Sequence, residues 1–105
     1  MIKVSPQAVQ QIKESARQGN ALGMALRVAV QKKPDGNFHY AMGFDEVKAQ
    51  GDVVVEVDGV QVVFDEQQKP LLEGMTIDFV ELEPGQHNFI FLNPNEPGYV
   101  PPKED

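Results

Sequence analysis

The chain has 105 residues, enough for one domain with a single hydrophobic core, and it contains no cysteine. The missing thiols exclude disulfides, thiolate-held metals and clusters, and thiol redox chemistry within the chain. The formal net charge of -7 repels phosphate groups, so we expect neither nucleic acid nor an anionic membrane as a partner.

An amphipathic helix is predicted near the N-terminus. Ser5 can cap this helix with its hydroxyl, and Pro6 suits the first helical position, where its missing N–H costs nothing. An apolar stripe at helical spacing follows, formed by Ala8, Val9, Ile12 and Ala16. Gly19 and Asn20 then end the helix. Because such a stripe most often packs on a core, we expect the helix to dock on the rest of the domain.

A β-hairpin is predicted over residues 24–44. Its two arms, residues 24–31 and 38–44, alternate between apolar and polar positions as half-buried strands do. Between them, the Pro-Asp-Gly sequence of residues 34–36 has strong turn chemistry. In the second arm, alternation places His39 on the polar face of the strand.

A second hairpin is predicted over residues 53–64. A β-branched run leads into Asp58 and Gly59, a favoured two-residue turn, and an alternating run returns. After it we expect a short helical turn and two more strands, at residues 65–74, 76–80 and 88–92.

These elements predict an α+β domain with one N-terminal helix, six or seven short strands and one helical turn. The hairpins and the absence of crossover helices favour antiparallel or mixed sheets packed on each other. We expect the domain to occupy residues 1–95, and a flexible Pro-rich tail to occupy residues 96–105.

The sequence offers few groups for catalysis. Ser5 is explained as a helix cap and Thr76 as a strand residue, and neither lies in a nucleophile motif, so we expect no enzyme. Asp35, His39 and His87 could hold one iron or zinc ion if they converged in space. Their spacing fits no metal motif, which favours solvated histidines and no cofactor. The carboxylates are scattered, and only a deep pocket that paired them would point to an enzyme.

Two segments near the end of the chain carry a family resemblance. They are Gly-Met-Thr-Ile-Asp-Phe-Val at residues 74–80 and Phe-Ile-Phe-Leu-Asn-Pro-Asn at residues 89–95. Further matching pieces are residues 2–8, 26–30, 44–46 and 59–65. With them, nearly the whole chain resembles the A-type iron–sulfur carriers, the IscA, SufA and HesB group. The resemblance implies a compact, β-sandwich-like domain of two mixed sheets with a helix packed against it.

The sequence departs from this family at the cluster ligands. The resemblance places the three cysteines of the carriers at Asp35, Val100 and Pro102 of this chain. Valine and proline cannot ligate a metal through their side chains, and one carboxylate cannot replace three thiolates. The resemblance therefore does not imply that this chain carries a cluster.

The resemblance implies instead an accessory or regulatory protein of iron–sulfur or sulfur metabolism that acts through protein contacts. Cysteine-less relatives of this kind are associated with the Dsr sulfur-oxidation system. Candidate contact residues are Asn93, Asn95, Tyr99 and Val100. The alternative is a weak iron binder or iron donor that uses Asp35, His39 and His87. Because the chain has no signal-peptide or spanning segment and is acidic, we expect a cytoplasmic monomer.

Overall fold

The computed structural model describes residues 2–47 and 50–99 of the chain. The elements in chain order are β1 (Lys3–Val4), α1 (Pro6–Gln18), β2 (Ala25–Lys32), β3 (Phe38–Asp45), β4 (Asp52–Val57), β5 (Val60–Asp65), the 3-10 turn η1 (Glu66–Gln68), α2 (Lys69–Leu72), β6 (Thr76–Glu83) and β7 (Gln86–Leu92). No helix in these two ranges is long and apolar enough to cross a membrane.

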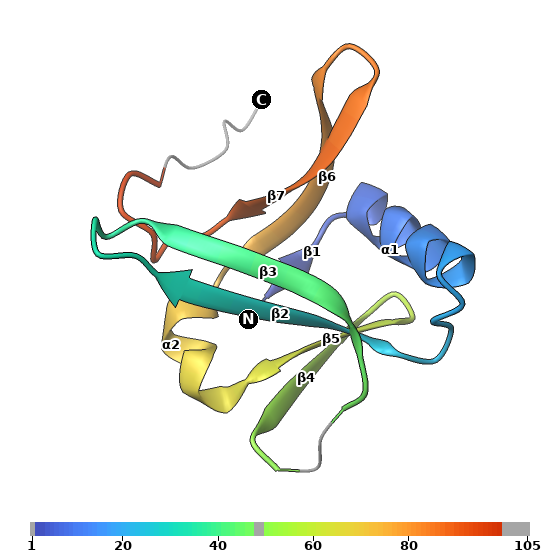
Figure 1. Cartoon of the computed structure of the whole chain (residues 1–105), viewed down its shortest axis with the longest axis horizontal. Helices are drawn as coiled ribbons and strands as arrows, with labels where there is room; N and C mark the ends of the chain where they lie inside the picture. Colours follow the sequence, from blue (N-terminus) through green and yellow to red (C-terminus); the bar gives the residue numbers. More distant parts are fainter. Residues whose placement is uncertain (1, 48–49, 100–105) are drawn as a thin grey trace.

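The strands form two mixed sheets, which confirms the predicted fold class. One sheet has the order β1-β6-β7 and the other the order β3-β2-β5-β4. In each sheet one neighbouring pair is parallel, β1 with β6 and β2 with β5, and the remaining pairs are antiparallel. Figure 1 shows the two sheets with α1 at one end, where the helix packs on β6 and β5.

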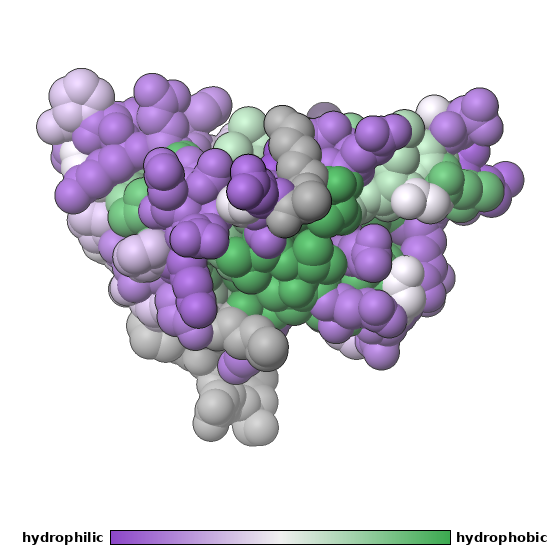
Figure 2. All heavy atoms as spheres, turned by 90° about the horizontal axis from the view of Figure 1, so that it is seen from below, coloured by the Kyte–Doolittle hydropathy of each residue, from purple (hydrophilic) through white to green (hydrophobic). Residues whose placement is uncertain are grey.

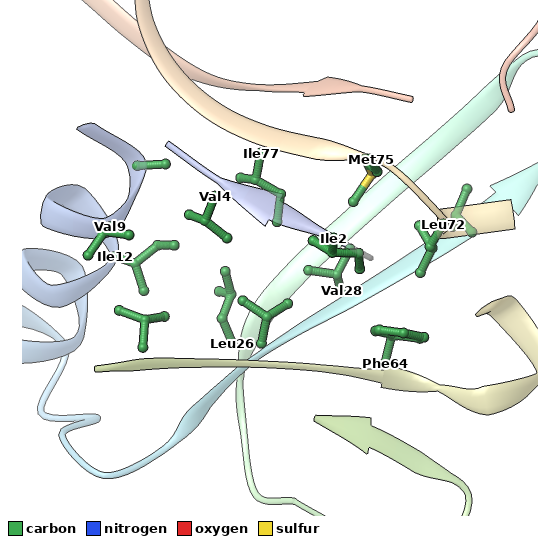
Figure 3. Packing of buried hydrophobic residues seen from close by; sticks show 14 of the residues in the cluster. Ile2, Val4, Val9, Ile12, Leu26, Val28, Phe64, Leu72, Met75 and Ile77 are labelled. Atoms are coloured by element: carbon green, nitrogen blue, oxygen red, sulfur yellow. The ribbon is translucent and has the colours of Figure 1, made fainter. Parts of the chain in front are cut away.

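The core lies between the sheets and is closed by α1 (Figure 3). All four residues of the predicted helical stripe are buried. Apolar residues of β2 and β5 face the same space, and Leu72, Met75 and Ile77 are fully buried on the side of the smaller sheet. The apolar residues that recur every 3.6 residues in the helix and every second residue in the strands therefore belong to one common core.

Ser5 fixes the start of α1 on the smaller sheet. Its hydroxyl oxygen accepts a hydrogen bond from the Ala8 N–H at 3.1 Å, and the hydroxyl donates to the Asp78 carboxylate at 2.5 Å. Asp78 also accepts from the N–H of Phe79 at 2.8 Å. This residue of β6 thereby holds the helix cap, which lies far from it in the sequence.

Three details differ from the expectations. β1 was missed, because two residues are too few to show a period, and its place is set by parallel pairing with β6. β6 and β7 extend further into their hairpin, to Glu83 and Gln86, where exposed residues carry no apolar alternation. At the end of α1 the left-handed residue is Asn20, with φ of 57°, and not Gly19.

Arg27 holds the connection between β3 and β4. The strand pairings make β3 and β4 parallel at opposite edges of the larger sheet, so this connection has to cross the sheet. The Arg27 guanidinium donates to Asp45 at the end of β3 at 2.7 Å, and to both carboxylate oxygens of Asp52 at 2.7 and 3.1 Å. It also donates to the Glu46 carbonyl at 3.2 Å. One side chain thus fastens both ends of the crossing.

The Arg27 ion pair is predicted to stabilise the fold strongly. The Asp52 side chain is only 4% exposed, and Arg27→Met removes the guanidinium that is paired with this buried carboxylate. We expect the free energy of unfolding to fall by about 3 kcal/mol in denaturant unfolding. Arg17→Met is the control, because Arg17 pairs with Glu14 on the exposed face of α1 and should matter little. Equal effects of the two variants would contradict this role of Arg27.

Candidate functional site

The turn between β2 and β3 contains the first ligand position of the resembled family. Lys33 donates its N–H to the Asn37 carbonyl at 2.7 Å, and Gly36 donates to the Lys33 carbonyl at 2.9 Å. The exposed Asp35 carboxylate accepts from the Asn37 N–H at 2.9 Å and from the Asn37 side-chain amide at 3.3 Å. Both carboxylate oxygens of Asp35 are therefore engaged in shaping the turn.

The Asn-Pro-Asn turn after β7 is anchored by a buried amide. Asn93 is 1% exposed and is the buried polar residue of the described chain. Its side-chain nitrogen donates to the Leu71 carbonyl of α2 at 2.7 Å. Its side-chain oxygen accepts from the backbone and side-chain nitrogens of Asn95, both at 2.9 Å. Buried polar groups are costly unless bonded in this way, so Asn93 fixes the end of β7 onto α2.

Two further contacts hold the same turn. The Asn95 side chain donates to the Glu73 carbonyl at 2.8 Å, just after α2. Gly74 has φ of +80°, and a Cβ there would lie 3.3 Å from Cγ of Pro94. A side chain at Gly74 would meet both backbone strain and the Pro94 ring, which explains a glycine opposite the turn.

The first residues after the turn are tied to β3. The Tyr40 hydroxyl donates to the Glu96 carboxylate at 2.6 Å, and the Tyr40 ring stacks on Phe91 with 4.5 Å between centroids. The backbone continues in turns, with Glu96 donating to the Asn93 carbonyl at 3.1 Å and Tyr99 donating to the Glu96 carbonyl at 3.2 Å. Burial, and then the Glu96 bond, raise the pKa of Tyr40, while a bond with Asn93 acts in the opposite sense.

The β2–β3 turn and the start of the tail lie side by side. A Cβ on Gly36 would lie 3.9 Å from Cγ of Pro97, which is van der Waals contact. The structure thus brings the Asp35 turn next to the segment that leads towards Val100 and Pro102. These last two positions lie outside the described residues.

The two histidines lie apart, with His39 close to the β2–β3 turn and His87 on another hairpin. His39 is exposed on β3 and pairs with Gln31 of β2. His87 is exposed near the end of the β6–β7 hairpin, where it stacks on Phe79 and its Nε2 lies 3.8 Å from Glu81. In Figure 1 that hairpin projects at the top of the view, well apart from the β2–β3 turn at the left. Within residues 2–47 and 50–99, no three His, Cys, Asp or Glu side chains could hold a metal together.

The candidate contact residues receive different surroundings. Asn93 is buried and serves the turn, whereas Asn95 is exposed although its amide is bonded within the chain. Tyr99 is partly buried, and Val100 lies outside the described residues. The sequence analysis missed the role of Asn93 as a buried anchor. The signal for it was a pair of asparagines on either side of a proline at the end of a strand. Also overlooked was Ser15, whose hydroxyl accepts from Gln11 within α1.

Comparison with known families agrees with this geometry. A family model described as iron-sulphur cluster biosynthesis matches residues 1–96. The chain belongs to the iron–sulphur cluster biosynthesis family. Its shared region ends at Glu96, the residue that Tyr40 holds.

Several relatives in this family cover most of the chain. A protein from Aquifex aeolicus with a solution NMR structure is 39% identical, covers 89% of this chain and 91% of its own, and has a TM-score of 0.66. The iron-sulfur cluster insertion protein ErpA of Xylella fastidiosa (strain M12) is 34% identical over 84% of this chain and 68% of its own. The crystal structure of IscA with the [2Fe-2S] cluster is 26% identical over 90% of this chain and 86% of its own, with a TM-score of 0.76.

The donor set of this chain does not fit an iron–sulfur cluster. Protein-held clusters take thiolates, with imidazole as the known replacement. This family member has no cysteine, its Asp35 carboxylate is bonded to Asn37, and its two histidines lie on different hairpins. The fold of the family is therefore present without ligands suited to its cluster.

The Asn93 anchor predicts a measurable loss of stability on truncation. Asn93→Ala removes the bond to Leu71 and the acceptor for Asn95. We expect the free energy of unfolding to fall by about 2 kcal/mol. Asn88→Ala on exposed β7 is the matched control and should have little effect. Similar losses for both variants would show that the buried bonds of Asn93 do not matter.

Tyr40 predicts a loss of stability in alkaline solution. An unfolded tyrosine ionises near pH 10, while the folded chain keeps the Tyr40 proton to higher pH because its pKa is raised. The stabilisation is therefore complete below about pH 10 and falls as pH rises above it. Tyr40→Phe should flatten this fall in unfolding curves measured from about pH 9 to about pH 12, and Tyr99→Phe should retain it. An unchanged slope in Tyr40→Phe would overturn this interpretation.

Proposed function

We propose that the chain is a non-enzymatic accessory protein of iron–sulfur cluster biosynthesis that acts through protein contacts and not by carrying a cluster. The observation that carries this proposal is the Asp35 turn. At the first ligand position of the family it presents a carboxylate already bonded to Asn37, in a chain with no cysteine. The surrounding scaffold is nevertheless maintained by specific bonds, which supports a surface kept for recognition.

The proposed contact surface combines the β2–β3 turn with the tail. Lys32, Lys33 and Asp35 are exposed on the turn, and Pro97 and Gly98 are exposed beside it. In this proposal residues 1–95 form the domain and residues 96–105 the contact tail. The chain would act as a monomer, because no cluster bridges two copies and each copy carries the same acidic charge.

Within this class, we propose an accessory role in sulfur oxidation, as in the cysteine-less Dsr-associated relatives that the sequence resembles. Its support is the shared absence of cysteine. Slower oxidation of reduced sulfur compounds in a strain that lacks the chain would support this pathway, and unchanged oxidation would contradict it. The iron-donor alternative gains no support, since His87 lies on a different hairpin from Asp35 and His39.

The contact role is tested by affinity purification from the producing organism. The bait is the full chain, and the matched variant ends at Tyr99, which preserves the Tyr40–Glu96 bond and hence the fold. We expect proteins of cluster assembly to copurify with the full chain and to be at least about tenfold depleted with the truncated one. Equal recovery with both baits would remove residues 100–105 from the contact surface.

A cysteine graft tests whether ligand loss alone explains the absent cluster site. We predict that Asp35→Cys, Val100→Cys and Pro102→Cys combined will bind iron and sulfide during anaerobic reconstitution, because the family scaffold is retained. The control is Asp35→Cys alone, which supplies one thiolate and should gain no colour. Cluster formation in this single variant would show that other side chains complete a site.

A further inference from the structure

β4 is an open edge of the larger sheet. In the part of the chain that the structure describes, β4 pairs with β5 alone, in continuous antiparallel register from Asp52 to Val57. No other loop or turn hydrogen bond given for these residues involves its backbone between Val53 and Val57. One side of this strand is therefore available for pairing with another chain.

The hairpin geometry shows which backbone groups are free. Asp58 and Gly59 both have positive φ, 49° and 86°, as in the two-residue turn that right-twisted hairpins favour. Val57 and Val60 flank this turn and form a hydrogen-bonded pair, after which bonded and non-bonded pairs alternate. Val54 and Glu56 consequently direct their N–H and C=O groups away from β5.

β4 carries few of the devices that usually protect an edge, and its exposed charge is Glu56. It has no proline, no lysine and no bulge, and four of its six residues are valine. The edge strand β1, by contrast, has only two residues, and the β6–β7 pair has a register shift near the hairpin end. A valine-rich edge of six residues in continuous register is suited to accept an extended strand.

Apolar surface lies beside the free edge. A groove beside β4 is lined by Ile2, Val53, Val54, Val55, Phe64, Lys69 and Glu73. Val54 is 42% exposed. Figure 2, which views the molecule from the side of β4, shows a continuous hydrophobic area in the middle of this face with hydrophilic residues around it. An added strand could thus gain backbone bonds and bury apolar side chains together.

The charged side chains around the edge are mostly acidic. Exposed acidic residues lie on the β4–β5 hairpin and on the segment that follows it: Glu56, Asp58, Asp65 and Glu66. Lys69 is the one basic side chain that lines the groove. We propose that β4 docks an extended segment of a partner protein in which β-branched apolar residues alternate with lysine or arginine. A second copy of this chain, with its net charge of -7, is repelled from the same edge.

This contact would be separate from the β2–β3 turn and the tail, and it does not depend on whether iron is bound. The β2–β3 turn connects the strands at the other side of the four-stranded order from β4. If the chain were found to carry a cluster, the proposal of docking at β4 would still stand. If docking at β4 failed, the proposed function would still stand.

The probe is a capped heptapeptide of alternating lysine and valine, titrated into the full isotope-labelled chain and followed by NMR. We expect saturable shifts confined to amides of β4 and of the groove. A matched glutamate–valine peptide should bind at least about tenfold more weakly, because it meets the acidic rim with like charge. Comparable binding of both peptides, or shifts elsewhere on the surface, would overturn the proposal.

A proline variant tests the backbone contact directly. Val54→Pro removes an N–H that has no ladder partner, so the hairpin can remain folded while binding of the lysine–valine peptide falls at least about tenfold. Val54→Thr retains the N–H and should bind like the unaltered chain. Glu56→Pro, measured against Glu56→Gln so that the lost charge is matched, repeats the test at the next outward-facing N–H in case Val54→Pro fails to fold. Unaltered binding in the folded proline variant would exclude strand addition. Sedimentation could instead show that the unaltered chain is a dimer and that Val54→Pro is a monomer. In that case the occupant of the β4 edge would be a second copy of this chain and not a basic partner.

Discussion

The bonds of the buried Asn93 amide connect the parts of the candidate site. They fasten the end of β7 to the Leu71 carbonyl of α2 and hold Asn95 in the following turn. The next residues are also held in place, because Pro94 lies against Gly74 and Glu96 is bonded to Tyr40. The segment that follows then reaches the β2–β3 turn at Gly36. A polar group with all its partners inside the protein is thereby able to set the geometry of an exposed region.

This arrangement explains how the fold of a cluster-carrying family can exist without cluster ligands. The bonds that position the turn and the tail are made by amides, a tyrosine hydroxyl and a carboxylate, and none of them requires a metal. Without thiolates the chain has no affinity for a soft iron–sulfide core, whereas the bonds that hold the turn do not involve thiolates. The site can then retain its shape as a protein surface.

Local patterns predicted the parts of the fold that are local. The stripe Ala8, Val9, Ile12 and Ala16 was confirmed as the buried face of α1, and the alternation of residues 24–31 and 38–44 was confirmed as the β2–β3 hairpin. Parallel pairing of β1 with β6 leaves no signature in a two-residue strand, and the Arg27 bonds join residues 18 and 25 positions apart. The hairpin pattern left antiparallel and mixed sheets open, and the family resemblance pointed to two mixed sheets. The separation of His87 from Asp35 follows from strand order, which spacing along the chain does not encode.

The most direct measurement is the iron content of the unaltered chain after anaerobic incubation with ferrous iron and sulfide, followed by desalting and a visible absorption spectrum. We predict a colourless protein with no more iron than a non-binding control protein, since neither Asp35 nor the separated histidines offer a suitable donor set. A coloured protein that retains iron would contradict the loss of the cluster site and would identify the chain as an iron binder.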